Sequence, residues 1–147
     1  MTLYLDTSSL VKLYVSEAGS EDVRRLLGDA NVVATSVVAY PETRAALARL
    51  RRERTLTASQ VTSAKRAFEE QWSTYLTLEA SDAVCRTAGE LAEKYGLRGF
   101  DSIHLASFGE VARRAGVDGT RFSSFDARLN VAARKLTRTF ERAGQRE

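Results

Sequence analysis

With 147 residues, of which 44% are hydrophobic and 28% charged, the chain has the size and composition of a single globular domain spanning 1–147. No apolar run approaches the ~20 residues of a membrane span, and the single Cys85 excludes an internal disulfide. No basic segment followed by an apolar core stands at the start, so a secretory signal is not expected. These features predict a cytoplasmic protein, and the net charge of +3 permits nucleic-acid binding without requiring it.

Strand-like and helix-like segments alternate along the chain. Short apolar runs predict strands at 3–5, 31–36, 74–79 and 120–125. Amphipathic segments predict helices at 8–15, 21–29, 37–53, 60–72, 82–96, 100–116 and 126–136. This alternation predicts an α/β fold with three layers, α/β/α, and a mostly parallel central sheet whose ligands bind outside the carboxyl ends of the strands.

Two segments carry less regular signals. Pro41 lies about one turn inside the segment 37–53, which predicts a kink or a late start for that helix. The tail from residue 137 is polar and is expected to be loosely held, with an edge strand at 137–140 as the alternative.

Four carboxylates stand out from the other acids because they lie beside apolar segments. Asp6 and Asp126 each follow a predicted strand, and Glu42 and Asp101 lie near the starts of predicted helices. For each aspartate taken alone, helix capping worth ~1 kcal/mol is favoured over catalysis. Glu42 taken alone is explained by pairing with an arginine of its own helix.

Taken together, the four acids point to a metal site. Residues at the carboxyl ends of neighbouring parallel strands meet at one edge of the sheet, where several carboxylates repel each other unless a cation lies among them. Mg²⁺ prefers carboxylate oxygen and water, whereas the lack of a Cys–His cluster disfavours zinc.

The polar neighbours of these acids have two interpretations each. Ser8 and Ser124 are expected to orient carboxylates or metal-bound water, although helix capping explains hydroxyl groups equally well. Thr7 is most simply a helix cap. His104, three residues after Asp101, is better explained as a hydrogen-bonded histidine beneath the site than as a proton shuttle.

Four segments resemble the PIN-domain family, and specifically its VapC-type ribonuclease toxins, in the same order along nearly the whole chain. They are LYLDTSSLVKLY with Asp6, TSVVAYPETRAALAR with Glu42, LRGFDSIHLASF with Asp101 and FSSFDARLNVAA with Asp126. Three departures accompany the resemblance. Ser124 replaces a frequent threonine, Pro41 lies unusually close to the glutamate, and the tail after Lys135 has no glycine-led final strand.

The resemblance implies an endoribonuclease that depends on Mg²⁺ or Mn²⁺, acts on RNA and forms a homodimer. It also implies a VapB-like antitoxin whose C-terminal segment fills the active-site groove. Asp6, Glu42 and Asp101 would hold the principal metal, and Asp126 would complete the pocket or bind a second ion. The arginines nearest to these acids in the sequence are candidates for positioning the RNA backbone: Arg44, Arg98 and Arg128.

Two other classes of protein are alternatives to a nuclease. A Mg²⁺-dependent phosphatase or phosphotransfer receiver also places an aspartate at a strand end. However, Ser8 stands where a haloacid-dehalogenase phosphatase needs a second aspartate, and the receiver's paired acids and late lysine are missing. A non-catalytic PIN-like module that binds RNA or protein is the other alternative, against which the four intact acids favour catalysis.

Overall fold

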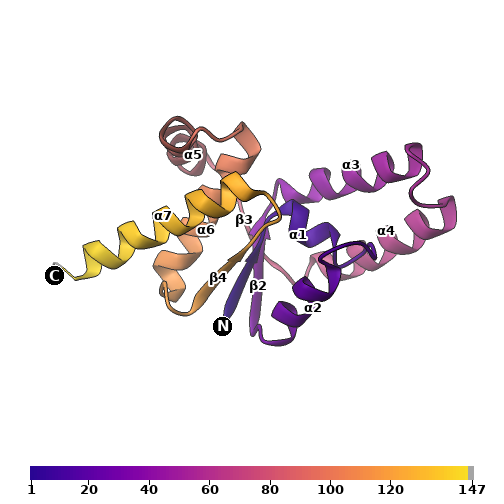
Figure 1. Cartoon of the computed structure of the whole chain (residues 1–147), viewed down its shortest axis with the longest axis horizontal. Helices are drawn as coiled ribbons and strands as arrows, with labels where there is room; N and C mark the ends of the chain where they lie inside the picture. The colour runs from indigo at the N-terminus through magenta and orange to yellow at the C-terminus, as the bar shows by residue number, and fades with distance from the viewer. Residues whose placement is uncertain (146–147) are drawn as a thin grey trace.

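A four-stranded parallel sheet forms the centre of the computed structural model, which describes residues 1–145 (Figure 1). Its strands run in the order β3-β2-β1-β4, and each pair of neighbours is parallel. The strands are β1 (Thr2–Leu5), β2 (Val32–Ser36), β3 (Leu76–Leu78) and β4 (Thr120–Ser123). All four carboxyl ends therefore meet at one edge of the sheet.

Helices connect the strands and cover both faces of the sheet. In Figure 1, α5, α6 and α7 lie on one side of the strands, and α1 to α4 lie on the other. The helices are α1 (Thr7–Val11), α2 (Ser20–Gly28), α3 (Ala39–Arg52), α4 (Ala58–Trp72), α5 (Asp82–Tyr95), α6 (Gly99–Ala115) and α7 (Ala127–Gly144). The predicted three-layer α/β/α class is confirmed, and the sheet is entirely parallel.

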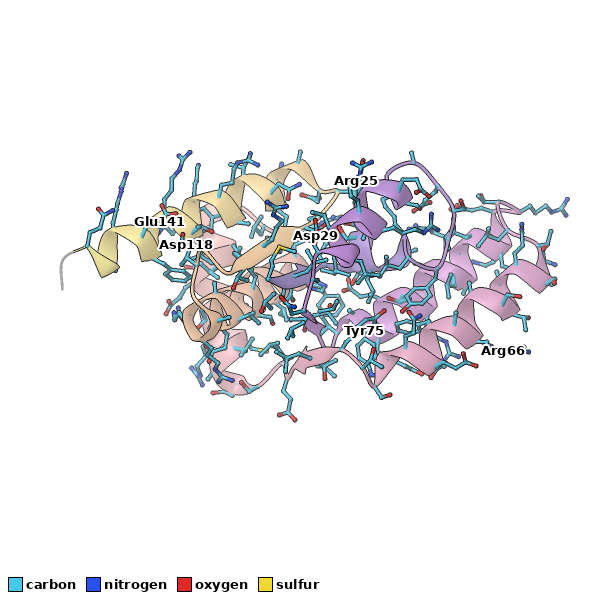
Figure 2. All side chains as sticks on the ribbon, turned by 90° about the horizontal axis from the view of Figure 1, so that it is seen from below. Arg25, Asp29, Arg66, Tyr75, Asp118 and Glu141 are labelled. Carbon is cyan, nitrogen blue, oxygen red and sulfur yellow. The ribbon has the colours of Figure 1, made fainter. Side chains whose placement is uncertain are left out.

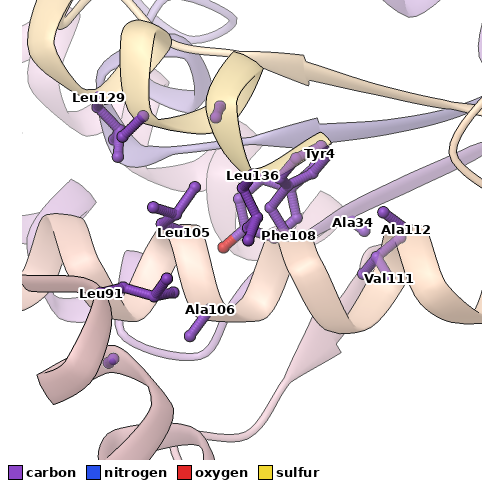
Figure 3. Packing of buried hydrophobic residues seen from close by; sticks show 13 residues of the cluster. Tyr4, Ala34, Leu91, Leu105, Ala106, Phe108, Val111, Ala112, Leu129 and Leu136 are labelled. Carbon is purple, nitrogen blue, oxygen red and sulfur yellow. The ribbon is translucent and has the colours of Figure 1, made fainter. Parts of the chain in front are cut away.

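The central strand β1 divides the core because successive strand side chains point to opposite faces of a sheet. Leu3 and Leu5 are fully buried against Leu10 of α1 and Phe68 of α4. Tyr4, also fully buried, faces the other cluster, where side chains of α5, α6 and α7 pack around it (Figure 3). A strand that is buried on both faces is typical of parallel sheets.

The start of α3 explains how Pro41 is accommodated. The helix begins at Ala39, so Pro41 lies in its first turn, where backbone N–H groups have no intrahelical partner to lose. The prediction of a late start is therefore correct. Ser36 ends β2 and does not cap this helix, whose N-cap is Val38.

The C-terminal segment differs from the prediction. Helix α7 does not end near residue 136 but continues to Gly144, so 137–140 is helical and the alternative of an edge strand is wrong. Leu136 is buried, and it lies with Phe140 over Gly109 of α6, which allows the two helices to approach closely. The tail thus carries an apolar stripe at helical spacing, and its last residues, 146–147, lie outside the described part of the chain.

Among residues 1–145, we find no helix whose length and apolar character would let it cross a membrane.

Candidate active site

The four singled-out carboxylates line one cleft of about 670 Å³ at the carboxyl edge of the sheet. Asp6 lies between β1 and α1, and Asp126 immediately precedes α7. Glu42 and Asp101 lie in the first turns of α3 and α6. The parallel topology brings the starts of α3 and α7 to the same end of the sheet, as Figure 1 shows. Four segments far apart in the sequence thus contribute one acid each.

Asp6 is the most buried of these acids, with 4% of its surface exposed. One carboxylate oxygen accepts hydrogen bonds from the Ser9 amide (3.0 Å) and from Ser8 Oγ (2.7 Å). The other oxygen accepts from Ser124 Oγ at 2.5 Å. Asp6 is therefore the N-cap of α1 and is also held in place by the two serines predicted to orient it.

Burial raises the pKa of Asp6, because desolvation penalises the charged carboxylate more than its three hydrogen bonds stabilise it. A buried carboxylate with a raised pKa and an open cleft beside it is an environment in which a cation would stabilise the charged form.

Ser8 and Ser124 also shape the segment that carries Asp126. Ser8 Oγ accepts from the Phe125 amide (2.9 Å), and Ser124 Oγ accepts from the Asp126 amide (3.0 Å). Asp126 lies three residues beyond the end of β4, and its carboxylate caps α7 by accepting from the Leu129 amide at 2.8 Å. The capping interpretation of Asp6 and Asp126 is thus correct, and both side chains still line the cleft.

Glu42 is held by a buried polar network that reaches the central strand. Its Oε1 accepts from Thr7 Oγ1 (2.6 Å) and bonds to His104 Nε2 (2.9 Å). His104 Nδ1 lies 2.9 Å from the hydroxyl of Tyr4. Burial acts to raise the pKa of Glu42, but the hydrogen bonds from His104 and Thr7, together with the charge of Arg98, lower it.

The network assigns the tautomer of His104. A carboxylate only accepts hydrogen bonds, so the proton is placed on Nε2, and Nδ1 accepts from Tyr4. The histidine is 2% exposed and lies beneath the site, as predicted. Thr7 does not cap α1, contrary to prediction, because its hydroxyl donates to Glu42. The sequence carried no signal for the role of Tyr4, which looks like an ordinary strand residue.

Arg98 occupies the space between the two remaining acids. Its Nε lies 3.1 Å from Asp101 Oδ2, and its Nη2 lies 3.8 Å from Asp126 Oδ2. The arginine side chain is 81% exposed, so the two contacts are weakly stabilising. Asp101, unlike the other two aspartates, caps no helix, since α6 begins after Arg98.

The rim of the cleft contains residues that were not predicted to belong to the site. Arg49 and Arg52 of α3 line it, and so does Phe100, whose exposed fraction is 57%. Arg49 lies seven residues after Glu42, two helical turns along the same face, so helical periodicity could have identified it.

Two of the three arginines predicted to position RNA lie outside this cleft. Arg44 bonds to Glu69 of α4 (2.6 Å) and to the hydroxyl of Tyr40. Arg128 donates to the carbonyl of Gly96 at 3.1 Å. Only Arg98 lines the cleft itself.

Comparison with known proteins identifies the class to which this fold and acidic cleft belong. The PIN-domain family matches residues 3–135. Ribonuclease VapC45 of Mycobacterium tuberculosis (strain CDC 1551 / Oshkosh) is 37% identical over 131 residues, 89% of this chain and 88% of the relative. Ribonuclease VapC46 of strain H37Rv is 34% identical over 134 residues, 91% of this chain and 92% of the relative.

A solved structure has the same fold. The crystal structure of M. tuberculosis VapC20, described as a Sarcin-Ricin loop cleaving toxin, matches with a TM-score of 0.62 and 20% identity, covering 88% of this chain and 94% of that one. The chain belongs to the PIN-domain family and, within it, to the VapC ribonucleases. The predicted family and enzyme class are thereby confirmed, and the phosphatase, receiver and non-catalytic alternatives are set aside.

Proposed function

We propose that this protein is the toxin of a toxin–antitoxin pair and cleaves RNA phosphodiesters with the help of Mg²⁺ or Mn²⁺. In this proposal Asp6, Glu42, Asp101 and Asp126 are the metal-binding and catalytic carboxylates. The observation that carries it is the convergence of these four acids, from four separate segments, on one cleft. Family membership supports the ribonuclease activity, and metal dependence is general in that family.

The donor set is compatible with Mg²⁺ or Mn²⁺ by its chemistry. Within residues 1–145, no three His, Cys, Asp or Glu side chains stand close enough together to hold an ion as they are placed. However, Mg²⁺ usually binds through one or two carboxylates and keeps several waters, so three direct protein ligands are not required. The guanidinium of Arg98 already acts as a cation between Asp101 and Asp126, which indicates that this pair favours a positive charge.

The residues of the chain have distinct tasks in this mechanism. A bound divalent ion would polarise the phosphoryl group and lower the pKa of a water. Asp6 would remain ionised beside it, oriented by Ser8 and Ser124, which hold both carboxylate oxygens. Glu42 is kept ionised and fixed by Thr7 and His104, so its free oxygen faces the cleft in one orientation.

Charged and aromatic groups around the acids would bind the substrate. Arg98 would contact the scissile phosphate region, and Arg128 would contact the RNA backbone just outside the cleft. Arg44 retains this role only if RNA displaces its contact with Glu69. The exposed ring of Phe100, beside Asp101, offers a surface on which a base can stack.

The proposed partners follow from the same family relationship. A VapB-like antitoxin would inhibit the enzyme by inserting its C-terminal segment into the cleft, and the toxin would act as a homodimer. Because the proposed substrate is cellular RNA, the proposed compartment is the cytoplasm.

A cleavage assay tests this function. Protein purified free of any antitoxin should cleave structured RNA in Mg²⁺ or Mn²⁺ and not in excess chelator. Asp101→Asn should abolish cleavage, whereas Asp118→Asn, in the loop before β4 at the opposite end of the sheet, should cleave like the wild type. Equal cleavage in chelator would disprove the role of the metal, and full activity of Asp101→Asn would disprove the assignment of the site.

A further inference from the structure

Helix α7 has the largest positive net charge of the described helices. Its residues Ala127–Gly144 include five basic side chains and one acidic side chain, a net charge of +4. The whole chain has a net charge of +3, so everything outside this helix sums to −1. The five basic residues are all exposed: Arg128, Arg134, Lys135, Arg138 and Arg142.

Within residues 1–145, these cations have no carboxylate partner. Among residues 1–145, no carboxylate oxygen lies within 4.0 Å of any of the five, whereas eight of the thirteen other arginines form such pairs. In Figure 2, side chains tipped with nitrogen project outward from α7, the yellow helix, away from the rest of the molecule. Repulsion among them favours an external anionic partner.

Three of the cations form a stripe along the helix. Arg128, Lys135 and Arg142 are seven residues apart, so they share one face and cover roughly 21 Å at 1.5 Å per residue. Two shallow hollows lie along this stripe, between α7 and the end of α5, where Lys94 and Tyr95 form the other wall. We call this surface the α5–α7 groove.

The α5–α7 groove begins at the rim of the acidic cleft. Asp126, which lines the cleft, is the N-cap of α7, and Arg128 is two residues further along. Arg128 bonds to the carbonyl of Gly96, which ends α5, and Arg98 then reaches back to Asp126. An extended polyanion leaving the cleft on this side meets the basic stripe directly.

We propose that the α5–α7 groove binds the phosphate backbone of the RNA substrate beyond the scissile site, with Lys94, Arg128, Lys135 and Arg142 as the contacting groups. This inference rests on the proposed ribonuclease function. The composition favours RNA over a protein partner, because lysine is depleted in the cores of protein interfaces and enriched where phosphates are contacted. Contacts to phosphates do not distinguish one base from another, so the groove would contribute affinity and orientation but no sequence specificity.

Binding to a fluorescein-labelled 16-nucleotide oligouridine, measured by fluorescence anisotropy in EDTA from 50 to 300 mM NaCl, tests the groove without cleavage. The test variant is Lys135→Ala/Arg142→Ala. The matched control is Lys65→Ala/Arg66→Ala, which removes one lysine and one arginine from the exposed face of α4. Circular dichroism should find both variants folded, because all four residues are exposed.

Each lost phosphate contact reduces the slope of log K against log[salt] by about 0.7, which corresponds to about five-fold in affinity at 0.1 M salt. The test variant should therefore bind about 25-fold more weakly at 0.1 M and have a slope smaller by about 1.4. The control should bind within about two-fold of the wild type.

Several outcomes separate this proposal from its alternatives. Wild-type affinity and slope in the test variant, or equal losses in both variants, would disprove the groove as an RNA site. Poly-glutamate serves as a second probe. If the test variant binds RNA like the wild type but no longer binds poly-glutamate, the groove is instead a site for an acidic protein partner. Failure of the wild type to cleave RNA in Mn²⁺ would disprove the proposed function, and the effect of the substitutions on binding would still be measurable.

Discussion

Replacing Asp6 by asparagine should stabilise the metal-free protein at neutral pH. The carboxylate is 4% exposed, and its pKa in the folded protein is raised from the usual 3.8 by desolvation. Asparagine keeps an oxygen that can cap α1 and accept from Ser8. Its amide can donate to Ser124 Oγ once that hydroxyl turns, so the charge is removed while the hydrogen bonds are largely kept.

The pH dependence of stability shows whether the charge of Asp6 stabilises or destabilises the metal-free protein. Because the folded pKa is raised, the native state holds a proton that the unfolded state has lost at pH values between 3.8 and the folded pKa. The stability of the metal-free wild type therefore falls as the pH rises through this window, and then stays constant. Each unit by which the pKa is raised lowers the free energy of unfolding above this window by about 1.4 kcal/mol, which lowers Tm by about 3–6 °C for a chain of this size.

Urea unfolding in EDTA at pH values from 4 to 8 measures this difference. The advantage of Asp6→Asn over the wild type should grow with pH and reach a plateau, whereas Asp118→Asn should stay within about 0.5 kcal/mol of the wild type throughout. Adding Mg²⁺ at one hundred times its Kd should raise the free energy of unfolding of the wild type by about 2.7 kcal/mol relative to that of Asp6→Asn, because only the wild type retains the Asp6 carboxylate as a metal ligand.

A lower stability of Asp6→Asn than of the wild type at pH 8 in EDTA would refute this reasoning. It would mean that the three hydrogen bonds outweigh desolvation and that Asp6 is a stabilising cap in its charged form.

Three further substitutions test the surroundings of the cleft. Arg98→Gln should tighten Mn²⁺ binding, measured by calorimetry, by up to about five-fold, because an exposed ion pair worth about 0.2–1 kcal/mol no longer competes for Asp101 and Asp126. His104→Asn, whose shorter amide can keep the contact with Tyr4 but does not reach Glu42, should weaken Mn²⁺ binding about ten-fold, with the circular dichroism spectrum unchanged. Gly19→Ala should destabilise by about 1–3 kcal/mol in thermal unfolding, because this glycine has a φ of 89° and its added Cβ would collide with the ring of Phe125.

Matched substitutions provide the controls for these three. Arg66→Gln, at an exposed position of α4, should leave the Mn²⁺ affinity unchanged. An unchanged Mn²⁺ affinity in Arg98→Gln would show that Arg98 does not compete with the metal. Normal Mn²⁺ binding by His104→Asn would show that Thr7 alone orients Glu42. Gly28→Ala, a helical position with open space around it, should not destabilise; equal loss at both glycines would contradict the packing argument.

Most helix ends were predictable because their signals are local. Ser81 caps α5 through its hydroxyl, Gly96 ends that helix with a φ of 64°, and Thr57 forms a capping box with Gln60. The end of α7 was missed because the turns beyond Leu136 are mostly polar, with Phe140 as their one large apolar residue. These two side chains gain stability only against α6, a contact that local pattern does not reveal.

In the candidate site, too, some features follow from local sequence and others only from tertiary contacts. The sequence by itself determined which acids are unusual, because an acid beside an apolar run is apparent without coordinates, and it determined the order of strands and helices through their periodicity. Only the tertiary structure decided that Asp6 is almost fully buried, that Thr7, His104 and Tyr4 form one network behind Glu42, and that Arg98 lies between Asp101 and Asp126. These contacts join residues up to 118 positions apart, as Ser124 and Asp6 do, and they arise because parallel crossovers bring every strand end to the same edge of the sheet.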